Sequence, residues 1–100
     1  MERGPQDLLT EAEITVALEE LPGWQLDPAT RTLRKTYTRT NFLDAVAFIQ
    51  QAAEIAEQQD HHPDIFLHKY KHLDFTLTTH SAGGITQNDL DLAKALDKAA

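Results

Sequence analysis

Apolar and polar residues alternate along the chain in ways that predict three helices and four strands. Each predicted helix starts at a capping residue with a partner three positions later: Thr10 with Glu13, Asn41 with Asp44, and Thr86 with Asp89. Two of these starts also have an apolar pair placed as a hydrophobic staple, Leu9 with Ile14 and Ile85 with Leu90. We therefore expect helices to begin just after residues 10, 41 and 86.

Apolar residues then recur every three or four positions, which places them on one face of each helix. These faces comprise Ile14, Leu18 and Leu21 in the first helix, Phe42, Val46, Ile49, Ala53 and Ala56 in the second, and Leu90, Ala93 and Leu96 in the third. Pro22-Gly23 is predicted to end the first helix, and Pro63 to prevent the second from continuing beyond the polar stretch 57–60.

The gaps between the helices carry the strand signals. Residues 24–26 and 32–38 flank the turn sequence 27–30 and predict a hairpin, and residues 65–70 predict a third strand. In the fourth strand, Leu73, Phe75 and Leu77 alternate with Asp74, Thr76 and Thr78, so that one face is apolar and the other polar. The order α-β-β-α-β-β-α predicts an α+β fold: a four-stranded antiparallel sheet with three helices packed on one face. The order in which the strands pair does not follow from the sequence.

One hundred residues are enough for a single domain with one modest core. We expect residues 1–9 to form a flexible N-terminal segment and residues 10–100 to form that domain. The absence of cysteine excludes a disulfide, a thiolate nucleophile and a sulfur-ligated metal. No apolar run is long enough to span a bilayer, and the first residues lack the apolar stretch of a secretory signal. We therefore expect a cytoplasmic protein that does not interact with membranes.

The formal net charge of -7 disfavours nucleic acid as a partner, because such binding usually requires a basic patch. The one local basic cluster, Arg31, Arg34, Lys35 and Arg39, is interleaved with threonines. We interpret that cluster as the solvated face of a strand.

Histidines are the residues most suited to chemistry. The chain has five: His61, His62, His68, His72 and His80. His61 and His62 lie where the long helix must end, and His80 lies at the end of the fourth strand. Imidazole titrates near neutral pH, so that such a cluster suits proton transfer in both directions. Asp60 and Glu57 precede the pair and could orient or polarise an imidazole.

Two other interpretations remain open on the residue pattern alone. Adjacent histidines at a helix end can cap free carbonyl groups, and His-rich sites can bind zinc. Against zinc, neighbouring histidines project in different directions and there is no HExxH-like helical pair, so we predict no metal. His68 and His72 are interpreted as solvent-facing residues without a role. Asp89 has a sufficient structural role as the capping partner of Thr86.

The stretch from Glu57 through Asp60 to His61-His62-Pro63, followed by Tyr70, His80 and Asp89, resembles the signature of the pterin-4a-carbinolamine dehydratases. The similarity continues through residues 77–80 and 83–86, and through Leu21-Pro22-Gly23-Trp24. It covers most of the chain from about Thr10 onward.

The resemblance implies an enzyme that dehydrates a 4a-hydroxytetrahydropterin to quinonoid dihydropterin, in tetrahydropterin recycling, without a metal or organic cofactor. It implies that His61, His62 and His80 are catalytic and surround the pterin, with His61 and His80 the best candidates for proton transfer. Asp60, Thr78 and Thr79 would also contact or help to position the substrate, and Glu57, Pro63 and Asp89 would support the site. The assignment of acid and base stays open.

The family resemblance also implies a homodimer or homotetramer. Two other functions remain as alternatives. One is a protein-interaction module, like the family member that serves as a dimerisation cofactor for a transcription factor. The other is a homologue that acts on another pterin, such as one in molybdenum-cofactor metabolism.

Overall fold

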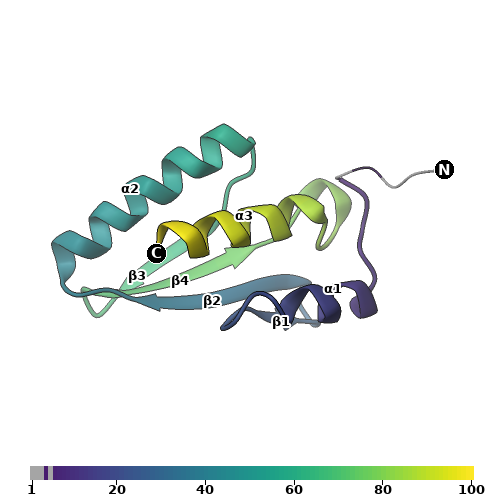
Figure 1. The fold of residues 1–100 in the computed structure, drawn as a ribbon, viewed down its shortest axis with the longest axis horizontal. Coiled ribbons are helices and arrows are strands. Elements are labelled where there is room, and N and C mark those ends of the chain that lie inside the picture. Colours follow the sequence, from purple (N-terminus) through teal and green to yellow (C-terminus); the bar gives the residue numbers. More distant parts are fainter. Residues whose placement is uncertain (1–3, 5) are drawn as a thin grey trace.

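The chain folds as three helices over a four-stranded antiparallel sheet (Figure 1). The computed structural model describes residue 4 and residues 6–100. The elements are α1 (Glu11–Leu18), β1 (Gln25–Asp27), β2 (Thr32–Thr38), α2 (Phe42–Gln59), β3 (Asp64–His68), β4 (His72–Leu77), the 3-10 turn η1 (His80–Ala82) and α3 (Gln87–Ala99). The strands pair in the order β1-β2-β4-β3. The predicted fold class and element order are confirmed.

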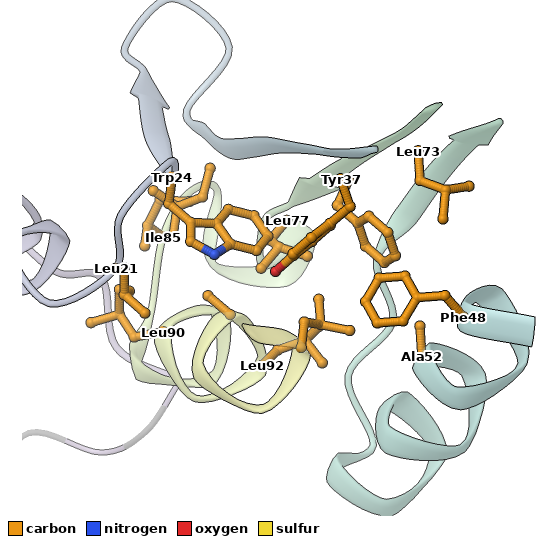
Figure 2. Packing of buried hydrophobic residues seen from close by; sticks show 14 of the residues in the cluster. Leu21, Trp24, Tyr37, Phe48, Ala52, Leu73, Leu77, Ile85, Leu90 and Leu92 are labelled. Atoms are coloured by element: carbon orange, nitrogen blue, oxygen red, sulfur yellow. The ribbon is translucent and has the colours of Figure 1, made fainter. Parts of the chain in front are cut away.

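The core lies between the apolar face of the sheet and the helices. Along β4 every second residue is buried, and these residues are the predicted Leu73, Phe75 and Leu77. Figure 2 shows Tyr37 of β2 and Phe48 of α2 meeting in this layer, with ring centroids 5.1 Å apart. The core therefore fixes α2 and α3 over the central strands, and with them the end of α2 and the start of α3.

The predicted helix starts are confirmed, because their signals are local. Thr10 and Glu13 form a capping box, and the side chain of Asn41 accepts a hydrogen bond from the backbone N–H of Asp44. Thr86 and Asp89 form the third capping pair. Leu90, Ala93 and Leu96 of α3 are buried as predicted.

The apolar row predicted for α2 is wrong in part as the side that faces the core, since Ile49 is half-buried against the core but other members point outward. Phe42 and Val46 are exposed at 51% and 42%, Ala53 is exposed as well, and only Ala56 of the predicted row is buried. The residues that face the core are Ala45, Phe48, Ala52 and Ala56. Apolar residues cover more than one side of α2, so their spacing alone does not identify the buried side. Small alanines on that side allow the helix to approach its neighbours closely.

Element ends differ from the prediction by a few residues. Helix α1 ends at Leu18 because the next residues form tighter turns, in which Leu21 N–H bonds to Leu18 O. Leu21 is still buried, but outside the helix. Strand β1 runs one residue later than predicted, and β3 ends at His68 because Lys69 and Tyr70 adopt positive φ angles of 48° and 60° in the hairpin turn.

Residues 1–3 and 5 of the predicted flexible segment lie outside the described residues. At the other end of that segment, Leu9 N–H donates to Ile85 O at 2.9 Å, which ties it to the turn before α3. Among the described residues, no helix combines the length and the apolar character needed to cross a membrane.

Candidate active site

The end of α2 presents two of the predicted histidines. Asp60 closes the helix in the left-handed conformation, at φ 51°, and His61 N–H then bonds back to Ala56 O at 3.0 Å. This reversal turns the chain away from the helix axis before Pro63. His61 and His62 therefore leave the helix at a sharp turn, which gives their side chains different surroundings.

His61 points inward to a buried carboxylate. Its Nε2 lies 2.5 Å from Oδ1 of Asp89, the third residue of α3. The side chain of His61 is 12% exposed and that of Asp89 is 0% exposed. The carboxylate bonded to His61 is therefore that of Asp89, whereas the Asp60 side chain makes no hydrogen bond within the described part of the chain.

Asp89 is held by the end of β4 and the start of α3. Its Oδ2 accepts hydrogen bonds from the Thr79 hydroxyl at 2.8 Å and from the backbone N–H of Thr86 at 2.9 Å. The hydroxyls of Thr79 and Thr86 are themselves 2.7 Å apart. All three residues are buried, so this network is shielded from competing water.

His62 lies outside that network. Its Nε2 is 2.5 Å from Oε2 of Glu57, one turn back on α2, and both side chains are mostly exposed. An ion pair so exposed stabilises the fold little. Glu57 therefore orients His62 at the surface rather than burying it.

His80 begins the turn η1 directly after buried Thr79, and its side chain is exposed. It makes no hydrogen bond or ion pair with the other described side chains. The preceding Thr78 directs its hydroxyl elsewhere, to Arg31 O at 3.0 Å. The structure therefore links His61 to Thr79 through Asp89 and pairs His62 with Glu57. Among the residues that the structure describes, the exposed side chains of His80 and Asp60 have no partner.

The two histidines without a predicted role lie on the sheet face that the helices leave open. His72 Nδ1 is 2.9 Å from the Thr38 hydroxyl, and His68 Nε2 is 3.1 Å from Asp74 without forming a hydrogen bond. A hydrogen bond from the Thr36 hydroxyl, with help from His68, lowers the pKa of Asp74. These residues form a separate polar cluster.

Two larger hollows of the surface lie away from the candidate site. A pocket of about 410 Å³ is lined by residues that include Leu9, Ile14, Arg31 and Ile85, and a more open one of about 660 Å³ lies beside α3. Neither contains a histidine. Within residues 4 and 6–100, no group of three or more His, Cys, Asp or Glu side chains is arranged to hold a metal ion.

His61, His62 and His80 all lie within a stretch of the chain that matches a family of known proteins. A family model described as "Pterin 4 alpha carbinolamine dehydratase" matches residues 7–99 of the chain. The chain belongs to this family.

Relatives of the pterin-4a-carbinolamine dehydratase family cover almost the whole chain. A protein of Rhizobium johnstonii named "Putative pterin-4-alpha-carbinolamine dehydratase" is 45% identical over 92% of this chain and 90% of its own length. One of the same name from Thermomicrobium roseum is 44% identical over 88% of this chain and 91% of its own length.

Solved structures support the same fold. The crystal structure titled "transcriptional coactivator/pterin dehydratase" from Brucella melitensis has a TM-score of 0.87 and 38% identity, and it covers 92% of this chain and 97% of that one. A pterin dehydratase-like RuBisCO assembly factor of the alpha-carboxysome has a TM-score of 0.66, with 78% of this chain and 89% of that one covered. At 20% identity, this second likeness shows the fold alone.

The sequence did not identify one residue of the candidate site in this member of the dehydratase family. Thr86 appeared only as a helix cap, but its hydroxyl also bonds to Thr79 beneath Asp89. The contact between His61 and Asp89 was not predicted either, because 28 residues separate the two in sequence. A capping role was sufficient to explain Thr86. The family resemblance gave Asp89 a supporting role, but it did not identify His61 as the residue that Asp89 contacts.

Proposed function

We propose that this protein dehydrates a 4a-hydroxytetrahydropterin to the quinonoid dihydropterin, in tetrahydropterin recycling in the cytoplasm. The observation that carries the proposal is the contact between His61 and buried Asp89, two residues of the stretch that resembles the family signature. A buried carboxylate holds an imidazole in one orientation and stabilises it when it becomes charged. His61 is therefore equipped to exchange a proton.

The reaction needs two proton transfers. The proton on N5 of the pterin is removed, the N5–H electrons form a double bond to C4a, and the C4a–O bond breaks. The departing hydroxyl takes a proton and leaves as water. General acid and base groups are sufficient for these steps, and no metal or organic cofactor is required.

We assign the proton transfers to His61 and His80. His62, oriented by Glu57 at the exposed end of α2, would bind and position the pterin. Asp60 and the backbone around Thr78 lie next to these histidines in the chain and would contribute further substrate contacts. Pro63 follows the two histidines and prevents the chain from continuing there as a helix.

The test is the rate of 4a-carbinolamine dehydration, followed by ultraviolet absorbance, for His61→Ala and His80→Ala. Each variant is expected to lose about 10²–10⁴-fold in kcat, which is the usual contribution of a general acid or base. The matched control is His72→Ala, which removes a histidine from the open sheet face and should leave the rate unchanged. Equal rates for all three folded variants would contradict the assignment.

A protein-interaction role is the second candidate, and two observations favour it. The Brucella melitensis relative is titled a transcriptional coactivator as well as a pterin dehydratase. The outer side of α2 also exposes Phe42, Leu43 and Val46, at 51%, 79% and 42%. We propose that this apolar surface, Phe42–Leu43–Val46, is the contact between copies of the chain in a homodimer or homotetramer.

A homologue specific for another pterin is the remaining alternative. The site residues named above act on the N5 and C4a atoms and do not select a pterin side chain. Comparing the dehydration rate of carbinolamines that differ only in the side chain at C6 would distinguish the alternatives. A preference for one of them would identify the substrate class.

A further inference from the structure

A chain of buried hydrogen bonds links the start of α3 to His61. It runs from the Thr86 hydroxyl to the Thr79 hydroxyl at 2.7 Å, on to Asp89 Oδ2 at 2.8 Å, and from Asp89 Oδ1 to His61 Nε2 at 2.5 Å. Thr86 and Asp89 are 0% exposed and Thr79 is 6% exposed. The direction of each hydrogen bond can therefore be worked out from the protein groups alone.

Thr79 has one hydroxyl proton, and an ionised carboxylate can only accept. The Thr79 proton is therefore donated to Asp89 Oδ2, and the Thr86 hydroxyl must donate to Thr79. The backbone N–H of Thr86 also donates to Oδ2. Oδ2 of Asp89 therefore accepts two hydrogen bonds, and these hold the carboxylate in one orientation beside His61.

An ionised Asp89 determines the tautomer of His61. Oδ1 of Asp89 has no proton to give, so His61 Nε2 must donate and carry the ring proton. In the neutral ring the other nitrogen, Nδ1, then holds a lone pair. Nδ1 has no hydrogen-bond partner among the described residues, while the side chain retains 12% exposure. Nδ1 is thus the atom of His61 that is free to react.

We propose that Thr79, oriented by Thr86, is a positioning residue that keeps His61 in the Nε2–H tautomer, so that Nδ1 is the base of the reaction. This inference rests on the proposed dehydratase function and deepens it. The N5 proton of the pterin passes to Nδ1, and the N5–H electrons form the N5=C4a bond. The C4a–O electrons leave with the oxygen, which takes a proton from a second group, His80. The resulting imidazolium still donates from Nε2 to Asp89.

The first test needs no turnover. Long-range ¹H–¹⁵N NMR spectra of the whole protein distinguish a protonated ring nitrogen from one with a lone pair. For wild type at a pH where His61 is neutral, we expect a protonated Nε2 and a lone pair on Nδ1. A protonated Nδ1 in wild type would overturn the proposal, whatever the protein's activity.

The second test removes the hydroxyl. Thr79→Val keeps the shape of the side chain, and the expected results are a mixed His61 tautomer and a fall in kcat of about 10–100-fold at an unchanged KM. Thr79→Ser restores the hydroxyl and should recover both the tautomer and kcat. The control is Thr76→Val in β4, three residues before Thr79, where the side chain lies on the open sheet face and makes no hydrogen bond within the described residues.

The possible outcomes distinguish a failure of this positioning proposal from a failure of the proposed dehydratase function. If Thr79→Val keeps both the wild-type tautomer and the wild-type kcat, Thr79 is not a positioning residue. If wild type shows the expected tautomer but no dehydration, the proposed function fails while the relay stands. If Thr79→Val does not fold, Thr86→Val is measured in the same two ways, since Thr86 orients Thr79 from the far end of the chain of hydrogen bonds.

Discussion

Among single residues, Asp97 holds several elements together, because one of its carboxylate oxygens accepts three hydrogen bonds. The Oδ1 atom of Asp97 accepts from Trp24 Nε1 at 3.1 Å, from Lys35 Nζ at 2.8 Å, and from the Tyr37 hydroxyl. These contacts fasten α3 to β2 and to the turn before β1. Burial, followed by the hydrogen bond to Asp97, raises the pKa of Tyr37 far above its usual value of 10.0.

A raised Tyr37 pKa makes stability depend on pH. Above pH 10 the unfolded chain loses the phenol proton while the folded protein keeps it, so that the free energy of unfolding falls as pH rises. The slope is at most about 1.4 kcal/mol per pH unit. Urea titrations between pH 9 and about pH 11 should therefore show a steeper fall for wild type than for Tyr37→Phe.

The control for this prediction is Tyr70→Phe, because Tyr70 is 59% exposed in the β3–β4 turn. That variant should keep the steep fall of wild type. The same slope for wild type and Tyr37→Phe would show that the Tyr37 hydroxyl is not protected by Asp97.

At the scale of whole elements, the capping residues predicted where each helix begins more accurately than apolar spacing predicted which side of α2 is buried. The side chain of Asn41 accepts from Asp44 N at 2.8 Å and begins α2 at the predicted place. Asn41→Ala is expected to lower the free energy of unfolding by about 1 kcal/mol, because the first turn loses a hydrogen-bond acceptor. Gln50→Ala, on an exposed side of the same helix, should stay within about 0.5 kcal/mol.

Chemical denaturation of both variants measures the difference. Equal stabilities of Asn41→Ala and Gln50→Ala would show that the cap does not stabilise α2. The contrast is informative because the two substitutions lie in one helix and differ in whether the removed amide makes a hydrogen bond to the backbone.

The side of α2 that faces the core was predicted less well than its start. A cap depends on neighbours three residues apart, whereas the buried side depends on what the helix packs against. Phe42 and Val46 fit the spacing of a buried row, yet the core selects Ala45 and Phe48. Spacing therefore identified an apolar surface but not its partner, and this surface is the one that we propose for self-association.

At the scale of the whole molecule, the order of the strands in the sheet places the residue after β4 next to the start of α3. Strand β4 is an inner strand, between β2 and β3, and its end delivers Thr79 beneath the start of α3. The sequence predicted the strands but not this order, because pairing depends on contacts between distant segments. The histidines could be selected from the sequence, whereas the link from His61 to Asp89 and Thr79 required the structure.

Self-association is the prediction that belongs to this scale. Size-exclusion chromatography with light scattering should give a homodimer or homotetramer for wild type and a smaller species for Leu43→Glu, since a charge would be buried at the contact. Val16→Glu is the control, because Val16 is an exposed apolar residue of α1, at 64%. A monomeric wild type at working concentrations would contradict the prediction.

The measurement that tests the central claim most directly is the dehydration rate of a 4a-hydroxytetrahydropterin with and without the wild-type protein. Stopped-flow ultraviolet absorbance follows the loss of the carbinolamine. The account predicts a large acceleration that scales with protein concentration and disappears in folded His61→Ala. No acceleration by folded wild-type protein would contradict the proposed dehydratase activity on that pterin.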